Sequence, residues 1–455
     1  MNRLAIHIND AGITLSNGEQ IVYREPGYAY LGDDRLTTGN EAFGHARIDP
    51  RRIQHRFWAE LDTKPLSDKR FGHLSAADLV SRQLEQIWNA AGRGVNELIV
   101  AVPAYMSAES LGLFLGIAGE LKLPVGALVD AAVASTRREY SGAVPVHIDL
   151  GLHKATLTRL AQPGMSQTDR SEVLNDAGIY ALYDAWIREI AEAFVQQSRF
   201  DPLHTATTEQ MLLDRLGGWV GQAANQGRVE MQIESGGTTY AAGIESLALI
   251  GAAAPVYQQI TSTLRALFRA EDMPAIQVTD RVARLPGLTD MLKARIGGEV
   301  FVLEPGATAR GALARCRAGS NQSGGVSLLR QLPWDQAPVD IGQHAVEGAN
   351  TGVPTHVLFG YNAYSIGDTP LILGSEEDGD ARFVALESEM PGVSRRHCSL
   401  VMRNGQCVLE DHSRYGTFLN GHRVDGTSVV QVGDALRIGS PGYEFQLITT
   451  DEVNG

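Results

Sequence analysis

The sequence predicts an α/β domain built from two related halves, followed by a smaller all-β sandwich. Strand–turn–strand patterns with an Asp-x-Gly tip occur twice, at residues 10–12 and 149–151. Strands and helices alternate up to about residue 318, whereas short strands alone fill residues 356–450. Because 455 residues are too many for one compact core, we expect two or three domains.

The composition argues against several classes of protein. A hydrophobic content of 44% and a charged content of 20% are normal for a globular protein. A formal net charge of −14 argues against a general nucleic-acid-binding protein, whose surface would be basic. Residues 1–16 do not form the apolar block of a secretory signal, and no apolar run approaches the roughly 20 residues of a membrane-spanning helix. We therefore expect a cytoplasmic protein without a membrane span.

The three cysteines are Cys316, Cys398 and Cys407. Their spacing gives neither a disulfide framework nor a metal site. We expect all three to be reduced thiols in a reducing compartment, and we expect no bound metal.

Residue patterns predict the elements of the first domain in chain order. Leu4, Ile6 and Ile8 alternate with polar residues before the first Asp-x-Gly tip, and Val146 and Ile148 alternate in the same way before the second. The other predicted strands are 96–102, a hairpin within 229–241, a strand from 276, and 300–303; the predicted helices are 108–121 with Ser107 as N-cap, 171–200, 246–268, 287–296 and 305–318. In the long helix, apolar residues at helical spacing predict a core-facing stripe: Ile179, Leu182, Trp186, Ile190 and Phe194.

Four features in this order resemble the actin-like ATPase superfamily, and especially the seventy-kilodalton heat-shock chaperones. They are the two Asp-x-Gly hairpins, the Val-Pro-Ala-Tyr strand end at 102–105, the segment 128–134 and the segment 278–286. The resemblance covers about residues 1–318 and implies a two-lobed fold of duplicated ribonuclease-H-like halves that clamp a nucleotide. By this resemblance, four residues would surround the phosphates and the water-bound Mg²⁺: Asp10, Gly12, Asp149 and Gly151.

Several positions at which this superfamily touches nucleotide are altered here. Leu152 and His153 replace glycines that let the backbone approach phosphate. Asp280 and Arg281 replace a Gly-Gly pair that lies against adenosine, and Arg281 is long enough to fill that space itself. We therefore expect an inactive ATPase fold with no catalytic residue and no cofactor. The alternative is an active, chaperone-like ATPase that binds ATP and Mg²⁺ and whose nucleotide state gates partner binding.

Residues 319–355 are predicted to link the two domains. Residues 320–325 are Ser-Asn-Gln-Ser-Gly-Gly, a composition typical of flexible linkers. Residues 328–334 form a small apolar island within this linker that could pack against either domain.

The second domain is organised around a predicted β-hairpin. Asn404-Gly405 favours a tight turn between two apolar runs, because both residues tolerate positive φ. If Arg403 and Gln406 flank this turn, Met402 pairs with Cys407 and Leu400 pairs with Leu409. These four paired residues then share one face, as a half-buried sheet requires. Cys398 and Cys407 are not cross-strand partners in this register.

The motifs around this hairpin resemble the forkhead-associated (FHA) domain, a β-sandwich that recognises phosphothreonine. They are Ser-Arg-Arg-His at 394–397, Gly-Thr-Phe-Leu-Asn-Gly at 416–421 and Gly-Asp at 433–434. The resemblance covers about residues 356–450. It implies that Ser394 donates to a phosphate oxygen, that His397 braces its loop from within, and that Asn420 is structural.

Two positions depart from the FHA pattern. Ser375 stands where the family has its phosphate-gripping Arg, and Tyr415 replaces the Asn that holds the peptide backbone. Arg395, Arg396 and Arg414 are nearby cations that could substitute. Two interpretations stay open: altered or weak phosphopeptide binding, and phosphate-independent docking of a partner.

Together these features predict a cytoplasmic adaptor or scaffold that acts in signalling and binds a partner protein. If the second domain binds phosphopeptides, this partner is phosphorylated on Thr. No nucleic-acid partner is expected, and the oligomeric state, including filament assembly, stays open.

Overall fold

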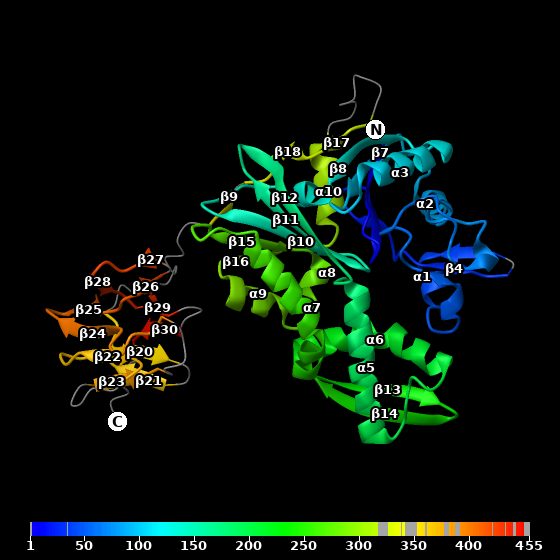
Figure 1. The fold of residues 1–455 in the computed structure, drawn as a ribbon. Helices are drawn as coiled ribbons and strands as arrows, with labels where there is room; N and C mark the ends of the chain where they lie inside the picture. The colour runs from blue at the N-terminus through cyan, green and yellow to red at the C-terminus, as the bar shows by residue number, and fades with distance from the viewer. Residues whose placement is uncertain are drawn as a thin grey trace. The chain divides into compact units, whose positions relative to one another are not determined.

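The computed structural model describes residues 2–33, 35–316, 326–337, 339–341, 353–359, 362–376, 382–386, 392–420, 422–432, 434–439 and 443–449 (Figure 1). The chain divides into two compact units, Met1–Ile341 and Gly342–Gly455. Each unit is described by itself below.

The first unit contains two six-stranded sheets in which five strands share one order. In each sheet, three strands that follow one another in the chain pair antiparallel. Two later strands lie on the other side of the first of these three, and both run parallel to it. The first sheet has β1 (Arg3–His7), β2 (Ile13–Ser16), β3 (Ile21–Glu25), β7 (Glu97–Val102) and β8 (Val125–Asp130). The second has β10 (Val144–Leu150), β11 (Lys154–Ala161), β12 (Met165–Asn175), β15 (Pro274–Val278) and β16 (Glu299–Val302). The two Asp-x-Gly tips therefore lie in equivalent hairpins, β1–β2 and β10–β11.

Helices bury both sheets. Strand β1 is buried from its second residue onward and β7 is buried throughout, as expected of strands covered on both faces. Helices α2 (Ala76–Ala91) and α3 (Ala108–Glu120) pack into the core of the first sheet. Helix α3 begins as predicted, because the Ser107 hydroxyl accepts a hydrogen bond from the Ser110 amide at 3.2 Å. The short elements of this half are β4 (Ala29–Leu31), β5 (Leu36–Thr38), β6 (Ile53–Gln54), α1 (Gly39–Phe43) and α4 (Ala131–Ser135).

The helices of the second half surround an added hairpin. Helices α5 (Ile179–Ser198), α6 (Ala206–Gln226) and α7 (Ser246–Ala266) lie with β13 (Arg228–Ser235) and β14 (Thr238–Glu245) at one end of the unit (Figure 1). The remaining helices are α8 (Asp280–Ala283), α9 (Leu288–Ile296) and α10 (Ala307–Arg315). The predicted stripe of α5 is buried as expected. The predicted start of this helix is wrong, because residues 171–175 continue β12 and pair with β11.

Residues 326–337 add a strand to each six-stranded sheet of the first unit. Strand β17 (Leu328–Leu329) pairs with β8 of the first sheet, and β18 (Gln331–Pro333) pairs with β12 of the second. Strand β19 (Val339–Asp340) then pairs with β9 (Tyr140–Ser141). The apolar island predicted within the linker therefore belongs to the first unit. The unit ends at Ile341 rather than at the predicted residue 318, because these strands pair with its sheets; residues 317–325 lie outside the described residues.

The second unit is a sandwich of two sheets in which most neighbouring strands are antiparallel. One sheet has β20 (His356–Phe359), β21 (Asn362–Ser365), β26 (Thr417–Leu419), β27 (His422–Arg423), β29 (Ala435–Ile438) and β30 (Tyr443–Ile448). The other has β22 (Leu371–Gly374), β23 (Arg382–Ala385), β24 (Cys398–Arg403), β25 (Gln406–Asp411) and β28 (Thr427–Val430). Apolar side chains from both sheets form one core. This unit bears out the predicted all-β sandwich.

The predicted hairpin register is confirmed. Met402 pairs with Cys407 and Leu400 with Leu409 across β24 and β25. Asn404 and Gly405 have φ of 51° and 78°, the left-handed values that a two-residue hairpin turn needs. All three cysteines are free and buried.

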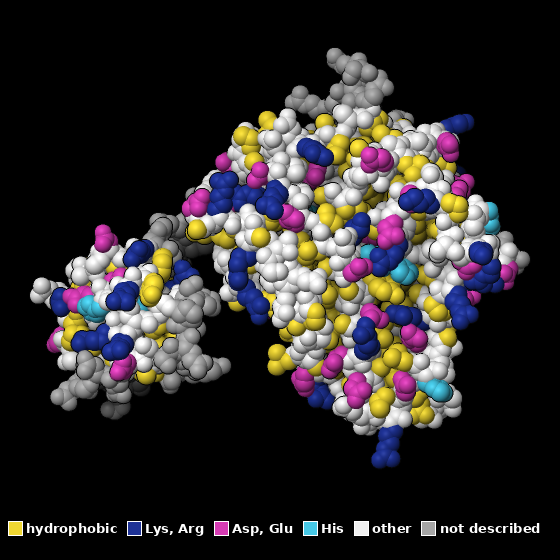
Figure 2. All heavy atoms as spheres, in the orientation of Figure 1, with side chains coloured by type: hydrophobic (Ala, Val, Ile, Leu, Met, Phe, Trp, Pro, Cys, Tyr) yellow, Lys and Arg dark blue, Asp and Glu magenta, His cyan; other side chains and the backbone are white. Residues whose placement is uncertain are grey.

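Charges on the visible surface are mixed. Figure 2 shows side chains of both signs scattered over the face of the first unit that it presents, without a large patch of one sign. Among the described helices, none is long and apolar enough to cross a membrane.

Candidate functional site

The first candidate site lies where the tips of the two equivalent hairpins meet. Asp10 Oδ1 accepts a hydrogen bond from the Leu152 amide at 2.7 Å, so the tips touch each other directly. Asp10 Oδ2 is buried and has no partner within the described part of the chain. Burial raises the pKa of Asp10 to about 6. Gly151 is required here, because a Cβ at this position would collide with Asp10 Oδ1.

Asp149, at the second tip, is held by hydrogen bonds on both oxygens. Oδ2 accepts from Asn9 Nδ2 at 2.7 Å, and Oδ1 accepts from Thr279 Oγ1 at 3.1 Å. His7 Nε2 lies 3.4 Å from Oδ2. Burial acts to raise the pKa of Asp149, but the charges of His7 and Arg281 outweigh it and leave the pKa below its usual value. Asp149 is therefore an ionised carboxylate whose oxygens already have protein partners.

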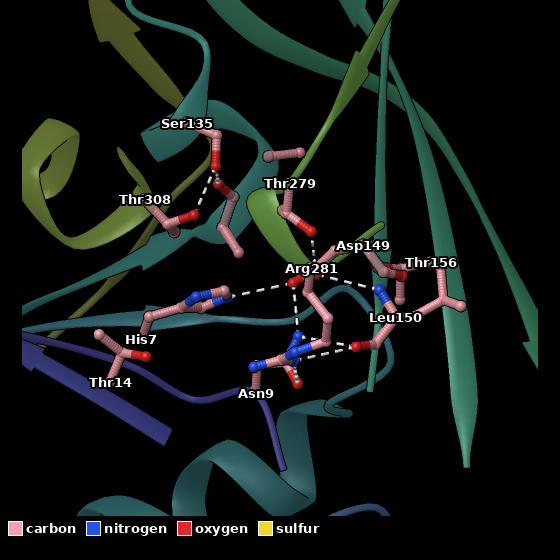
Figure 3. Close-up of polar contacts among 12 residues, drawn as sticks. His7, Asn9, Thr14, Ser135, Asp149, Leu150, Thr156, Thr279, Arg281 and Thr308 are labelled. Atoms are coloured by element: carbon pink, nitrogen blue, oxygen red, sulfur yellow. Dashed lines mark hydrogen bonds and ion pairs between the residues drawn. The ribbon is translucent and has the colours of Figure 1, made fainter. Parts of the chain in front are cut away.

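The side chain of Arg281 lies between the two hairpins (Figure 3). It enters from α8, and its Nη1 donates to Asn9 Oδ1 at 2.7 Å and to the Leu150 carbonyl at 3.1 Å. A Cβ added at Gly12 would lie 2.5 Å from Arg281 Nη2. One guanidinium thus bridges the first half to the second, close to both predicted acids.

The cavity on the side of this guanidinium that faces Asp149 is small. The cavity next to it, lined by His7, Asn9, Asp149, Arg281 and neighbouring side chains, has a volume of about 20 Å³. A cavity of this size holds about one water molecule. Mg²⁺ with its water shell and a phosphate chain do not fit there. In the described residues, no group of three or more His, Cys, Asp or Glu converges as a metal site.

The replacements expected to block nucleotide have different roles. Leu152 is buried, and only its amide reaches Asp10. His153 points to His55 of the first half: His153 Nε2 is 2.8 Å from His55 Nδ1, and the rings stack at 4.8 Å. Burial lowers the pKa of His153 to about 3, so its imidazole is neutral at pH 7. Asp280 and Arg281 form the first turn of α8.

The second candidate site is the pair of loops at one end of the FHA-like sandwich. The Ser394 amide donates to His397 Nδ1 at 3.1 Å, so this nitrogen carries no proton. His397 Nε2 therefore holds the proton and donates to the Gly416 carbonyl at 3.2 Å. The imidazole is buried, and burial lowers its pKa. His397 thus connects the Ser394 loop to the Gly416 loop. This position agrees with the bracing role that the FHA resemblance implies for it.

The same geometry positions the Ser394 hydroxyl. Ser394 Oγ accepts from the Arg414 amide at 3.3 Å, which leaves its own proton available to donate. The Ser375 amide donates to the Ser394 carbonyl at 3.2 Å, so Ser375 also borders this site. The structure therefore brings Ser375, Ser394 and Arg414 together.

The predicted cations differ in their surroundings. Arg395 Nε pairs with Glu376 at 2.9 Å, and both side chains are mostly exposed. Arg396 and Arg414 are exposed as well. Tyr415, the replacement for the family Asn, exposes 66% of its surface beside Arg414. These loops present arginines and an aromatic ring to solvent, both of which are frequent in protein recognition sites.

Asn420 has the structural position expected of it. Its Nδ2 donates to Asp434 Oδ1 at 2.7 Å, and its Oδ1 accepts from the Ala435 amide at 2.8 Å. Its φ of 50° is left-handed, which Asn tolerates. Asn420 thus closes the turn after β26.

Several residues of these sites were not predicted from the sequence. In the second unit, Asp411 accepts from the Ser413 amide at 3.0 Å and from Thr417 Oγ1 at 2.8 Å, which shapes the loop that carries Arg414. An Asp two residues before a Ser is a local turn signal that could have indicated this role. In the first unit, Asn9 and Thr279 hold Asp149, and no local pattern marks them.

A comparison with known protein families matches residues 371–439 to the FHA domain. No curated protein matches the chain. The matched segment contains β22 to β29 and both loops described above. FHA domains are protein-interaction modules that typically bind phosphothreonine, and the second unit of this chain contains one.

Proposed function

We propose that this protein is a cytoplasmic adaptor whose FHA domain docks a partner phosphorylated on Thr. The observation that supports this most is the pair of loops held together by His397. In it, the Ser394 hydroxyl can donate its hydrogen to a ligand and lies beside exposed Arg414. A phosphate brings nearly two negative charges and three acceptors, which such a hydroxyl and cation can bind. The family Arg is absent at Ser375, so the affinity is weak and depends on salt.

The test is the affinity of the full chain for a pool of phosphothreonine peptides with randomised flanks. At low salt, Ser394→Ala and Arg414→Ala should each weaken binding about fivefold or more. Arg403→Ala is the matched control, since Arg403 lies next to the Asn404-Gly405 turn, at the end of the hairpin away from the Ser394 loop. Binding that ignores phosphorylation and both substitutions would mean that the partner docks elsewhere on the sandwich.

We further propose that the first unit is a divergent actin-like fold that does not hydrolyse ATP. The repeated strand order of its two sheets and its paired Asp-x-Gly hairpins support this fold. Arg281 supports the loss of activity, since it occupies the space between the hairpins where the resemblance would place phosphate and Mg²⁺. On this proposal a cation of the protein itself joins the halves without nucleotide.

Calorimetric titration with Mg²⁺ and ATP tests this second part separately from the first. No saturable heat is expected from the wild-type chain. Saturable binding that is lost on Asp149→Ala would favour the alternative, an ATPase that gates partner binding.

A further inference from the structure

An arginine outside the two recognition loops reaches the Ser394 site from a neighbouring strand. Arg423 ends β27, which pairs with β26 so that Arg423 lies opposite Phe418. Its side chain contacts the Gly416 loop, since a Cβ added at Gly416 would lie 2.5 Å from Arg423 Nε. This is the loop that His397 connects to Ser394.

Gly416 allows this contact. Its φ of 94° is one that residues with a side chain rarely adopt, and without a Cβ its backbone stays uncovered. Arg423 Cζ and Cδ would lie 3.1 and 3.2 Å from the same added Cβ, so the side chain lies along the loop. The Gly416 amide donates to Ser413 Oγ at 2.7 Å, and its carbonyl accepts from His397. The loop is therefore held in place under the arginine.

The charge of Arg423 is not neutralised by the protein. Arg423 is exposed and has no ion pair within the part of the chain that the structure describes. Two other arginines of this unit differ from it. Arg395 pairs with Glu376 at 2.9 Å. Arg403 pairs with Glu410 at 2.5 Å. The positive charge of Arg423 is thus available to a ligand of the Ser394 site.

The loop sets the distance between Arg423 and a bound phosphate. Ser394 Oγ accepts from the Arg414 amide, so a phosphate held by Ser394 lies beside Arg414. Gly416, under Arg423, is two residues further along the chain, and two residues span at most about 7 Å. An extended peptide advances about 3.3 Å per residue. A ligand side chain that meets Arg423 therefore belongs to a residue about two positions from the phosphothreonine.

We propose that Arg423 makes this site selective for phosphothreonine peptides with an acidic residue about two positions from the phosphothreonine. The inference rests on the proposed function of the Ser394 site and adds the class of peptide that the site prefers. The Asp or Glu carboxylate of the peptide pairs with the Arg423 guanidinium. The exposed ring of Tyr415, between Arg414 and Gly416 in the chain, packs against the peptide residue in between.

Fluorescence anisotropy with labelled peptide pools and the full chain at low salt tests this preference. Three phosphothreonine pools carry Asp two positions before, Asp two positions after, or Asn at both positions, and the other flanking residues are randomised. Wild type should bind one of the Asp pools about two- to fivefold more tightly than the Asn pool, the effect of one exposed ion pair. The preferred side shows in which direction the peptide crosses Arg423. Equal affinities for all three pools would overturn the proposal.

Substitutions at Arg423 test which residue reads the acid. Arg423→Ala should bind the three pools alike, whereas Arg423→Lys keeps the charge and should keep the preference. Arg423→Glu should instead prefer a pool with Lys at the position of the preferred Asp. Arg403→Ala removes the same charge beside the Asn404-Gly405 turn and should leave the preference unchanged. A preference that persists in Arg423→Ala would contradict the proposal.

Unphosphorylated versions of the same pools separate this inference from the proposed function. If phosphorylation strengthens binding but no preference depends on Arg423, the proposed function stands and this inference fails. If phosphorylation changes the affinity of none of the pools, both fail.

Discussion

Replacing Arg281 with Ala should strongly destabilise the first unit. The substitution removes charge-assisted hydrogen bonds from Arg281 to Asn9 Oδ1 at 2.7 Å and to the Leu150 carbonyl at 3.1 Å. Hydrogen bonds of this kind each contribute about 1.5–3 kcal/mol. Asp149 keeps its bonds from Asn9 and Thr279, so it is not left without partners. We expect the free energy of unfolding to fall by about 3–5 kcal/mol.

Urea unfolding followed by tryptophan fluorescence measures this loss. All five tryptophans lie before residue 342, so the signal reports the first unit alone. Arg284→Ala is the control: its side chain is 65% exposed, and its removal should change the free energy of unfolding by less than about 1 kcal/mol. A loss below about 1 kcal/mol for Arg281→Ala, equal to that of the control, would refute the bridging role of Arg281.

Three further predictions follow from the same contacts. Burial raises the pKa of Asp10 from its usual 3.8 to about 6, so its contribution to stability is present below pH 4 and is lost as the pH rises through about 6. The free energy of unfolding of Asp10→Asn minus that of wild type should therefore be higher at pH 8 than at pH 4, by up to about 3 kcal/mol. A difference between the two proteins that does not change with pH would contradict this. His397→Ala should lower the free energy of unfolding of the second unit by about 2–3 kcal/mol in calorimetry and weaken phosphopeptide binding, because the tie between its two loops is lost; an unchanged affinity would remove His397 from the site. Limited digestion with a protease of broad specificity should cut first near the boundary between the two units, just after Ile341, and a first cut within 326–337 would show that the pairing of β17 and β18 is unstable.

Local sequence signals predicted the second unit well. The Asn404-Gly405 turn fixes the register of β24 and β25, because the side chains alternate from it with a period of two. The Ser394 and His397 loop lies at the end of this hairpin for the same reason. In the first unit, the Ser107 cap and the stripe on α5 were equally local signals and were also confirmed.

Features that depend on distant pairing were not predictable in this way. Residues 171–175 are polar enough to suit a helix surface, but they continue β12 because β11 pairs with them along its length. Residues 328–334 were predicted as an apolar island, and the partners of its strands β17 and β18, which are β8 and β12, lie far away in the chain. The length of Arg281 suggested that it fills the nucleotide space, yet its partners, Asn9 and Leu150, come from two other hairpins.

The start of α2 also carries a local sequence signal. Ser75 and Asp78 form a capping box at the start of α2: the Ser75 hydroxyl accepts from the Asp78 amide, and Asp78 Oδ2 accepts from the Ser75 amide at 2.8 Å. This Ser-x-x-Asp pattern is a recognised helix start.

The most direct test of the account is thermal melting of the full chain with candidate ligands. Phosphothreonine peptides, their unphosphorylated counterparts, and Mg²⁺ with ATP or ADP are added in separate samples, and a ligand that binds the native state raises the Tm of the unit it binds. We predict that phosphothreonine peptides raise the Tm of the second unit, that their unphosphorylated counterparts do not, and that neither nucleotide raises the Tm of the first unit. A rise with Mg²⁺ and ATP, together with no response to phosphothreonine peptides, would contradict it.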